Sequence, residues 1–387
     1  MESKSSAIAR LQTARSTITG LNAIDNISEE ISKFGKKVLI ICDKGIVKTG
    51  IVERVREKLE AGNYTVGLFD KVEPEPDIEL VYQCADVIKE KDYEVLIGLG
   101  GGSAMDVTKG ASIAVTNPGK IEDYLGIGLV QKKGLPMVLV PTTSGTGSEA
   151  TMAAIFTADN MKQGVFDPKI FPDVAIVDPS LTVSMPPKVT AATGMDALCH
   201  CLECYTALSA TSITDFIAKE GIRLISKSLR RAVYNGNDIE ARSDMALGSY
   251  YGGMCIANAS VTAVHALSFP LGADYHIPHG VANAIMLPYV IRYNCLANVE
   301  RFREIAILMG EKVEHLSMRD GALMAAESVE TLMKDIGLPL KLKDIDIPRD
   351  VIPSMAERAL TVQRLLTMNP RFMGLDDIIE IYERAYE

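Results

Sequence analysis

Four of the five histidines in this 387-residue sequence fall between positions 200 and 279, in arrangements that suit a divalent cation. Asp196 and His200 are four residues apart in TGMDALCH, so a helix would present both on one face. His265 and His279 share the segment VHALSFPLGADYHIPHG with His276, and spacing alone does not exclude His276. Carboxylate oxygens and imidazole nitrogens are ordinary ligands of Fe²⁺, Zn²⁺ and Mn²⁺. Asp196, His200 and two of the later histidines therefore predict a four-ligand metal site that leaves room for a substrate oxygen.

The candidate ligands and the polar residues near them also have purely structural interpretations. Asp196 follows a glycine where a helix would begin, and a lone buried histidine is commonly bonded to the backbone. His315 lies in an acidic stretch and is expected at the surface. The cysteines in CHCLECY invite a zinc-finger interpretation, but the nearest cysteine downstream is Cys255, so no second ligand pair follows at finger spacing. Three cysteines are instead expected to be small buried packing residues, namely Cys199, Cys201 and Cys204.

Two loops rich in glycine and hydroxyl groups are each expected at the end of a buried strand. YEVLIGLGGGS runs from an apolar strand into Gly100–Ser103, and LPMVLVPTTSGTGSE runs into residues 142–148. Glycines let backbone N–H groups approach a phosphate, and a helix N-terminus adds favourable partial charge. The spacing is not GxGxxG, so the Rossmann fingerprint is missing and a tight strand-to-helix turn is the alternative. Asp106 is expected to orient the first loop or cap the helix after it.

Asp43 ends the first buried strand, KKVLIICD, where a carboxylate can accept hydrogen bonds from ribose hydroxyls. Its charge would repel a 2′-phosphate, which favours NAD over NADP. The alternative is a helix cap or turn residue.

The elements that must position these residues divide the chain in two. Up to about residue 180, short apolar β-branched runs alternate with helical patterns, with strands at 37–43, 64–70, 93–100, 135–141 and 173–179 and helices at about 46–61, 77–91 and 105–115. Such alternation predicts a parallel sheet covered on both faces. Beyond Pro186 and Pro187 the pattern is helical, including segments near 299–310, 318–336 and 350–360. We therefore expect an α/β dinucleotide-binding domain at 1–185 and an all-helical metal-binding domain at 186–387, with the ligands between them.

Bulk composition excludes several classes of protein. A hydrophobic content of 47% with 23% charged residues is typical of a globular enzyme, and a net charge of −10 without a basic block argues against nucleic-acid binding. No apolar stretch approaches the length that spans a bilayer, and the N-terminal residues lack the apolar segment of a secretory signal. Seven scattered cysteines make a disulfide framework improbable. A cytoplasmic protein with no membrane partner is therefore expected.

Five sequence blocks resemble the iron-containing (group III) alcohol dehydrogenases. They are GGGSAMDVTK, PTTSGTGSEAT, AIVDPSLTVSMPP, ATGMDALCHCLE and HALSFPLGADYHIPHGVANAIMLPYVIRYN, which together cover roughly residues 37–295 in the family's order. The resemblance implies the dehydroquinate synthase-like fold, an α/β domain followed by a helical one. It also implies an assembly of two or more copies.

Carried over residue by residue, the resemblance implies that Asp196, His200, His265 and His279 hold the metal and form the catalytic centre, which leaves His276 out. Fe²⁺ is the implied ion, with Zn²⁺ as the alternative. It further implies that NAD contacts a set of loop residues, which are Asp43, Gly101, Gly102, Thr142, Thr143, Thr146 and Lys162; Ser103 and Asp106 join them from the loop pattern itself.

The implied reaction is hydride transfer between nicotinamide and a small primary alcohol or its aldehyde, in a direction that the sequence leaves open. The metal would polarise the substrate oxygen. The pocket implied by the resemblance is small and mostly apolar, formed by Ala153, Ala154, Ala257, Val261 and Phe269. Many members of the family have histidine where this chain has Phe269. Since phenylalanine cannot relay a proton, water or another group must do so, and His276 is one candidate.

Three alternative functions remain open at this point. Glycerol dehydrogenase-like polyol oxidation and a dehydroquinate synthase-like lyase belong to the same superfamily. The lyase would need several Lys and Arg residues near the metal, and the blocks around His200 and His265 contain almost none. A non-enzymatic dinucleotide- or metal-binding protein is the third.

Overall fold

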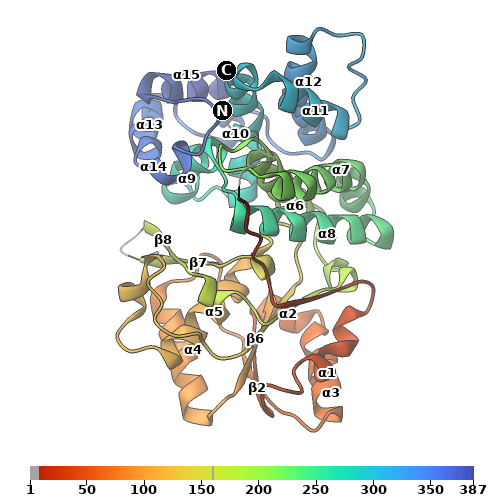
Figure 1. The fold of residues 1–387 in the computed structure, drawn as a ribbon, viewed down its shortest axis with the longest axis vertical. Coiled ribbons are helices and arrows are strands. Elements are labelled where there is room, and N and C mark those ends of the chain that lie inside the picture. Colours follow the sequence, from red (N-terminus) through yellow and green to blue (C-terminus); the bar gives the residue numbers. More distant parts are fainter. Residues whose placement is uncertain (1–7, 159–160) are drawn as a thin grey trace. The chain divides into compact units, whose positions relative to one another are not determined.

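The computed structural model describes residues 8–158 and 161–387, which form two compact units (Figure 1). One unit is Gln12–Met185, and the other contains Pro186–Glu387. The described residues of the segment Met1–Leu11 group with the second unit, whereas the sequence placed them in the first domain. The assignment of dinucleotide binding to one unit and metal binding to the other remains a prediction. Each unit is described by itself below.

The first unit is built on a six-stranded sheet in which every neighbouring pair of strands is parallel. The strands run in the order β1-β9-β6-β4-β2-β3. Their bounds are Ser16–Thr19 (β1), Lys37–Ile41 (β2), Thr65–Phe69 (β3), Val95–Gly100 (β4), Met137–Pro141 (β6) and Val174–Val177 (β9). The predicted parallel sheet is therefore confirmed, with one strand more than expected, since the polar segment STIT of β1 carries no apolar pattern.

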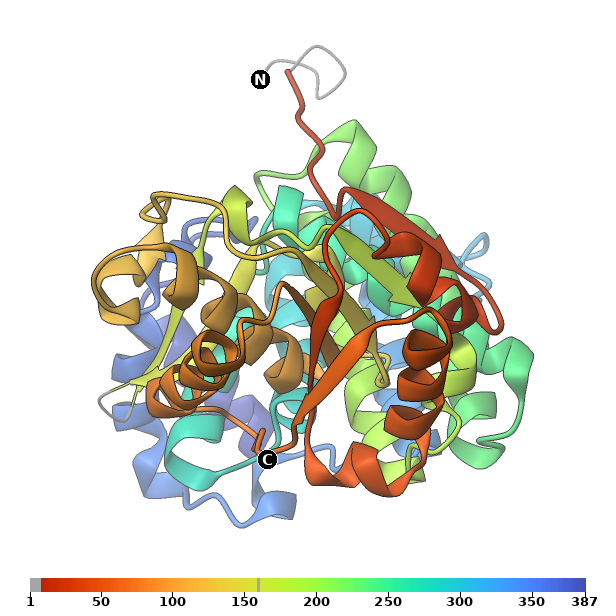
Figure 2. The same cartoon turned by 90° about the horizontal axis from the view of Figure 1, so that it is seen from below.

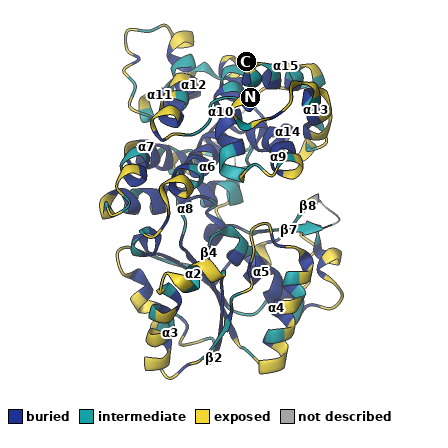
Figure 3. Cartoon of the chain, turned by 180° about the vertical axis from the view of Figure 1, so that it is seen from behind, coloured by how far each residue is buried: buried dark blue, intermediate teal, exposed yellow. Residues whose placement is uncertain are grey.

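Alternate residues of each strand point to opposite faces of this sheet, so one short apolar run serves two hydrophobic cores. Val38 and Ile40 of β2 belong to a core with α1 (Ile27–Glu30) and α3 (Ile51–Ala61), whereas Leu39 and Ile41 face α4 and α5. Helices α4 and α5 span Ile78–Lys91 and Gly102–Thr116. Figure 2 shows the strands between these two pairs of helices, and Figure 3 shows the outer faces of α3 and α4 exposed.

The two glycine-rich loops leave neighbouring strands at the same edge of the sheet. Gly100, at the end of β4, is in register with Pro141, at the end of β6. The backbone N–H of Thr142 donates to the carbonyl of Gly100 at 3.0 Å, which joins the two loops at their first residues. Carboxyl ends of parallel strands are where ligands bind in such sheets.

Two local features of this unit differ from the prediction. The helix expected at about 46–61 is broken at Gly50, whose φ of 81° is left-handed, into α2 (Lys44–Lys48) and α3. A second, three-stranded sheet contains β5 (Gly126–Ile127), β8 (Met161–Phe166) and β7 (Ala153–Ala158), none of which was expected. These strands are short or rich in alanine, glycine and polar residues, so their apolar alternation is weak.

The second unit is helical, as the sequence predicted, and contains the largest hydrophobic core of the described residues. Its helices are α6 (Pro187–Thr206), α7 (Ser212–Tyr234), α8 (Ile239–Asn258), α9 (Ala263–Tyr275), α10 (His279–Asn294), α11 (Val299–Leu308), α12 (Met318–Asp335), α13 (Ile352–Leu360), α14 (Gln363–Leu366) and α15 (Leu375–Tyr386). Helix α6 packs against α7, α8 and α10, so the helix with Asp196 and His200 lies at the centre of the unit. Among the described residues no single helix is long and apolar enough to cross a membrane; α8 and α9 meet both criteria only when taken together, as a pair bent by 105°.

Candidate functional site

Four side chains of the helical unit bring their donor atoms together in one place. These are Asp196 and His200 of α6, His265 of α9 and His279 of α10, and their nearest oxygen and nitrogen atoms all lie within 4.8 Å of one another. His200 Nε2 lies 3.1 Å from His265 Nε2 and 3.5 Å from Asp196 Oδ1. His279 Nε2 lies 3.6 Å from the same Asp196 oxygen. Asp196, His200 and His265 are buried, while the side chain of His279 is 36% exposed, so the cluster opens on the His279 side.

These separations fit a tetrahedral transition-metal ion. For ligand bonds of about 2.0–2.2 Å, neighbouring tetrahedral ligand atoms lie about 3.3–3.6 Å apart. Three imidazole nitrogens and one carboxylate oxygen suit Fe²⁺ or Zn²⁺, and this donor set does not choose between them. The donor atoms therefore fit the metal that the sequence predicted.

Close packing of helices brings the donors together. Asp196 and His200 share one face of α6, which begins at Pro187, a residue type suited to the first helical turn. Gly280, directly after His279, lies against α6 so closely that a Cβ there would be 2.2 Å from the carbonyl oxygen of Ala192. Only glycine allows this approach, which places the start of α10 beside Asp196.

Glu203 orients His265, and sequence reasoning did not identify it. Its Oε1 accepts hydrogen bonds from the N–H of Thr262 (3.0 Å), the hydroxyl of Thr262 (2.7 Å) and the N–H of Val264 (2.7 Å), so it caps the N-terminus of α9. Its Oε2 is hydrogen bonded to His265 Nδ1. Because a carboxylate with these donors only accepts, His265 Nδ1 carries the proton and Nε2 keeps its lone pair for the cluster.

The imidazoles and hydrogen-bond donors around the two buried carboxylates lower the pKa of each. Burial would raise the pKa of Asp196, but His200, His279 and His265 together hold it below the ordinary value. Burial likewise acts to raise the pKa of Glu203, and His265 with the α9 donors lowers it overall. The centre thus contains an anionic donor that is ready for a cation.

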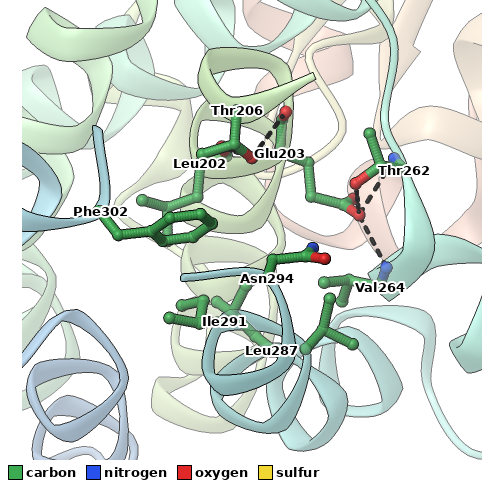
Figure 4. A pocket seen from close by; sticks show the side chains of 10 residues that line it. Leu202, Glu203, Thr206, Thr262, Val264, Leu287, Ile291, Asn294 and Phe302 are labelled. Carbon is green, nitrogen blue, oxygen red and sulfur yellow. Dashed lines mark hydrogen bonds between the residues drawn. The ribbon is translucent and has the colours of Figure 1, made fainter. Parts of the chain in front are cut away.

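Figure 4 shows a small cavity beside Glu203, with the hydrogen bonds from Thr262 and Val264 to its carboxylate. Its volume of about 10 Å³ is that of about one water molecule. The remaining walls are mostly apolar, from Leu202, Leu287, Val290, Ile291 and Phe302. This cavity is too small to hold an alcohol substrate and a nicotinamide ring.

Phe269 occupies the position where many members of the family have histidine, and it lies beside the metal cluster. Its ring centroid is 6.5 Å from that of His279. His276, the alternative ligand, caps the C-terminus of α9 with a left-handed φ of 53° and is exposed, outside the four-residue cluster. His315 is exposed, as expected.

The cysteines around His200 behave as packing residues. Cys199, Cys201 and Cys204 are fully buried in the helical core, and all seven cysteines are unpaired. The Cys199 thiol donates to Glu203 Oε2 at 3.7 Å, and burial, followed by the carboxylates of Glu203 and Asp196, raises its pKa well above the ordinary value. A second donor group of Cys199, Glu203 and His265 is thus a poor metal site.

In the α/β unit, glycines of the first loop pack against threonines of the second loop. A Cβ on Gly102 would lie 3.0 Å from Thr146 Cγ2, and a Cβ on Gly101 would lie 3.5 Å from Thr143 Oγ1. Gly101 caps α5, so the free N–H groups of Gly102 and Ser103 open toward this junction. The predicted loop residues therefore lie together, around the N-terminus of a 15-residue helix.

Unpaired hydroxyls in the second loop support a phosphate or ribose ligand. Thr142 Oγ1 and Ser144 Oγ are buried, and neither has a hydrogen-bond partner. A buried hydroxyl without a partner costs about 1–3 kcal/mol, which a bound ligand oxygen would recover. The residues present therefore fit a dinucleotide.

Asp106 forms hydrogen bonds within the protein that suit the expected orienting role, and its predicted contact with the cofactor stays a prediction. Ser148 Oγ donates to its Oδ1 at 2.9 Å, and the N–H of Ile155 donates to its Oδ2 at 3.2 Å. Lys109, one turn later on α5, places its Nζ within 3.0 Å of four oxygen atoms, which belong to Ser148, Thr151 and Ala153. Both residues hold the second loop against α5.

Asp43 is the N-cap of α2, accepting from the N–H groups of Gly45 (2.7 Å) and Ile46 (3.1 Å) through Oδ1. A Cβ on Gly100 would lie 3.8 Å from its Oδ2, so the other carboxylate oxygen faces the first loop. Lys162 of β8 pairs with Glu75 at 2.5 Å. Its predicted contact with the cofactor remains a proposal.

The residues of the predicted substrate pocket lie in both units. Ala153 and Ala154 belong to β7, and Ala257 lies at the end of α8. Val261 and Phe269 are partly buried against the helical core. The pocket that they were predicted to form together remains a prediction.

Sequence reasoning missed Glu203, Asn283, Lys109 and Glu149. Glu203 lies three residues after His200 on the same helical face as Asp196, and Asn283 follows His279 by four residues, so helical spacing from the predicted ligands would have found both. Lys109 and Glu149 have no such signal, because their burial depends on the packing of β7 over α5.

Comparison with known proteins agrees with this geometry. Residues 14–179 match the iron-containing alcohol dehydrogenase family, and residues 190–386 match the C-terminal part of the Fe-containing alcohol dehydrogenase family. Long-chain-alcohol dehydrogenase 1 of Geobacillus thermodenitrificans is 40% identical over 384 residues, which cover 98% of this chain and 97% of that protein.

Two solved structures are similar over nearly the whole chain. A 1,3-propanediol oxidoreductase has a TM-score of 0.96 at 38% identity and covers 98% of this chain and 100% of its own. A sulfoacetaldehyde reductase from Bifidobacterium kashiwanohense, solved in complex with NAD⁺, has a TM-score of 0.88 at 30% identity, with coverages of 98% and 99%.

The chain belongs to the iron-containing alcohol dehydrogenase family. The resemblance seen in the sequence is confirmed, and it extends well beyond the expected residues 37–295, because the family match runs from residue 14 to residue 386.

Replacing Gly280 by alanine should separate α10 from α6. The new Cβ would overlap the Ala192 carbonyl, and such overpacking costs about 1–3 kcal/mol. We expect a lower Tm and loss of bound metal by elemental analysis, because His279 moves with α10. Gly374→Ala is the matched control, since its Cβ would meet nothing closer than 3.6 Å at a φ of −96°. Full metal content in Gly280→Ala would contradict the proposed role of this contact.

Replacing Glu149 by glutamine should change the pH dependence of stability. Burial raises the pKa of Glu149 from 4.5 to about 7, and its Oε2 is buried without a hydrogen-bond partner. Between these values the unfolded chain ionises Glu149 while the folded protein keeps it protonated, so the native protein loses stability as pH rises. We expect the Tm of Glu149→Gln to exceed that of the native protein by several degrees at pH 7 and to match it near pH 4.5. Parallel Tm curves for the two proteins would exclude this, and Glu57→Gln, at an exposed position on α3, is the control.

Proposed function

We propose that this protein is an NAD-dependent alcohol dehydrogenase and aldehyde reductase that uses Fe²⁺ or Zn²⁺. The observation that carries the proposal is the convergence of the Asp196, His200, His265 and His279 donor atoms within 4.8 Å of one another. Support also comes from the glycine–threonine cradle with its unpaired hydroxyls and from the match to the family over both units. The NAD⁺ complex of the similar sulfoacetaldehyde reductase supports the choice of cofactor.

A bound metal would supply Lewis-acid polarisation of a substrate oxygen, and NAD would supply the acceptor or donor of hydride. The protein's part is to hold these groups and exclude water. Asp196 provides one negative charge, and Glu203 keeps His265 in the tautomer whose Nε2 lone pair faces the centre. Gly101, Gly102 and the threonines of the second loop would hold the cofactor phosphates and ribose.

Phe269 makes one wall of the centre apolar, beside His279. Because its ring has no ionisable group, it cannot transfer the proton that alcohol oxidation releases. We propose that water on the open side of the cluster, where His279 is 36% exposed, carries this proton. His276 is exposed at the end of α9 and is not part of the four-residue cluster.

The substrate is proposed as a small alcohol or aldehyde in a pocket that includes Phe269 and Val261. The similar proteins are named for a long-chain alcohol, 1,3-propanediol and sulfoacetaldehyde, so the family name does not select one substrate. We further propose a homodimer or larger homo-oligomer and a cytoplasmic location.

The direct test is turnover by the whole protein after loading with Fe²⁺ or Zn²⁺. The absorbance of NADH is followed with panels of alcohols, diols including glycerol, and aldehydes, with and without metal. Metal-dependent NADH formation or consumption is expected. A protein that binds NAD and metal but shows no turnover with any member would contradict the proposal and favour the non-enzymatic alternative.

His265→Ala and His279→Ala should each abolish turnover, because each removes one of four donor atoms. The expected loss is at least about 1000-fold in kcat, with metal content reduced in elemental analysis and the Tm of the metal-free form nearly unchanged. His315→Ala, at an exposed position, is the control and should retain activity. Full metal occupancy in both cluster variants would remove them from the proposed ligand set.

Asp43→Gly should shift cofactor preference toward NADP. The variant removes the carboxylate that faces the first loop, and glycine as an N-cap costs only a few tenths of a kcal/mol. We expect the ratio of kcat/KM for NAD to that for NADP to fall about tenfold or more. Asp77→Gly, which removes the N-cap of α4, is the matched control. An unchanged ratio in Asp43→Gly would refute the ribose role.

A further inference from the structure

A fifth side chain, Asn283, touches most of the metal cluster. It lies on α10 one turn after His279 and is fully buried. Its Nδ2 lies 2.8 Å from Asp196 Oδ1, 3.1 Å from His265 Nε2 and 3.1 Å from His279 Nε2. One amide nitrogen is therefore within hydrogen-bond distance of three of the four donor atoms.

The chemistry of these neighbours determines which end of the amide faces them. Asp196 Oδ1 accepts a hydrogen bond from Asn283 Nδ2 at 2.8 Å. His265 donates its Nδ1 proton to Glu203, so its Nε2 is also an acceptor. An amide oxygen in this position would face a carboxylate and a lone pair and would be repelled, whereas the NH₂ group donates to them. The hydrogen-bond network thus fixes the nitrogen toward the cluster.

This orientation leaves the other end of the amide unsatisfied. Asn283 Oδ1 is buried and has no hydrogen-bond partner. An unpaired buried acceptor is destabilising, so the amide is held in place by what its nitrogen does at the cluster rather than by the surroundings of its oxygen. The contacts of Asn294, on the same helix, are different: its amide exchanges two hydrogen bonds of 2.8 Å with the side chain of Asn369.

We infer that Asn283 is a positioning residue that stands in for the cation when the metal is absent. Its two N–H groups supply positive partial charge to two acceptors at a time among Asp196 Oδ1, His265 Nε2 and His279 Nε2, which lie on three helices. A cation satisfies the same lone pairs and makes these hydrogen bonds redundant. Asn283 therefore stabilises the metal-free form selectively and lowers the affinity for metal by the same free energy. This inference rests on the proposed metal centre.

The test is Asn283→Leu in the full-length protein. The leucine side chain is similar in shape to that of asparagine but lacks its amide N–H groups. Tm is measured for the metal-free and Zn²⁺-loaded forms, and Zn²⁺ affinity is measured by competition with a chelator. We expect the metal-free Tm to fall more than the Zn²⁺-loaded Tm, and Zn²⁺ affinity to rise about tenfold. The matched control Asn294→Leu removes a buried amide about three turns further along the same helix. It should lower both Tm values equally and leave the affinity unchanged.

Equal falls in the two Tm values of Asn283→Leu, or weaker Zn²⁺ binding, would overturn the inference and make Asn283 an ordinary packing residue. If the leucine variant does not fold, Asn283→Ala is measured in the same way with the same expectation. Failure of both variants to fold even with Zn²⁺ would also overturn it. Native protein that binds no Zn²⁺ overturns the metal centre itself, whereas native binding with an unchanged affinity in both variants removes only the role of Asn283.

Discussion

The helical unit depends on holding four electron-rich donor atoms together in a buried place. Where the lone pairs of a carboxylate oxygen and an imidazole nitrogen, or of two imidazole nitrogens, face one another at separations such as 3.1, 3.5 and 3.6 Å, they repel unless a proton or a cation lies between them. Two buried side chains, Glu203 and Asn283, form hydrogen bonds with the atoms of this cluster. Glu203 binds the Nδ1 proton of His265, so the Nε2 lone pair faces the cluster, and the Asn283 amide donates to that lone pair.

Close helix packing makes such a cluster available, and packing in turn depends on small residues. Gly280 sets α10 against α6, and Gly252 of α8 leaves room for His200, whose Cβ would be 3.2 Å from a Cβ at position 252. These glycines do not serve turns. They remove side-chain volume where backbones must approach, so the positions of the donor atoms follow from backbone packing rather than from flexible side chains.

In the α/β unit, the candidate site is formed by two loops at the edge of a sheet rather than by packed helices. Parallel strands β4 and β6 deliver two loops to the same edge, and buried polar contacts rather than apolar packing join them. Lys109 binds oxygen atoms of the second loop from α5, and desolvation on burial lowers its pKa to about 8. Asp106 fixes Ser148 beside it. A ligand at this edge meets a rigid cradle, which limits the entropy lost on binding.

The sequence alone determined the parallel sheet, the helical second half, the glycine-rich loops and the candidate ligands, with three histidines open for two of the four places. These features leave local patterns: apolar β-branched runs, helical spacing and one Asp–His pair four apart, Asp196 and His200. It did not determine β1 or the β5-β8-β7 sheet, whose residues are stabilised by neighbours distant in the chain. Only the tertiary structure decided that His276 lies outside the cluster and that Glu203, Asn283 and Lys109 act at the two sites. Helical spacing marks Glu203 and Asn283 as neighbours of the ligands on their own helices, but their contacts with other elements arise from packing, and local sequence carries no signal of which helix will face which.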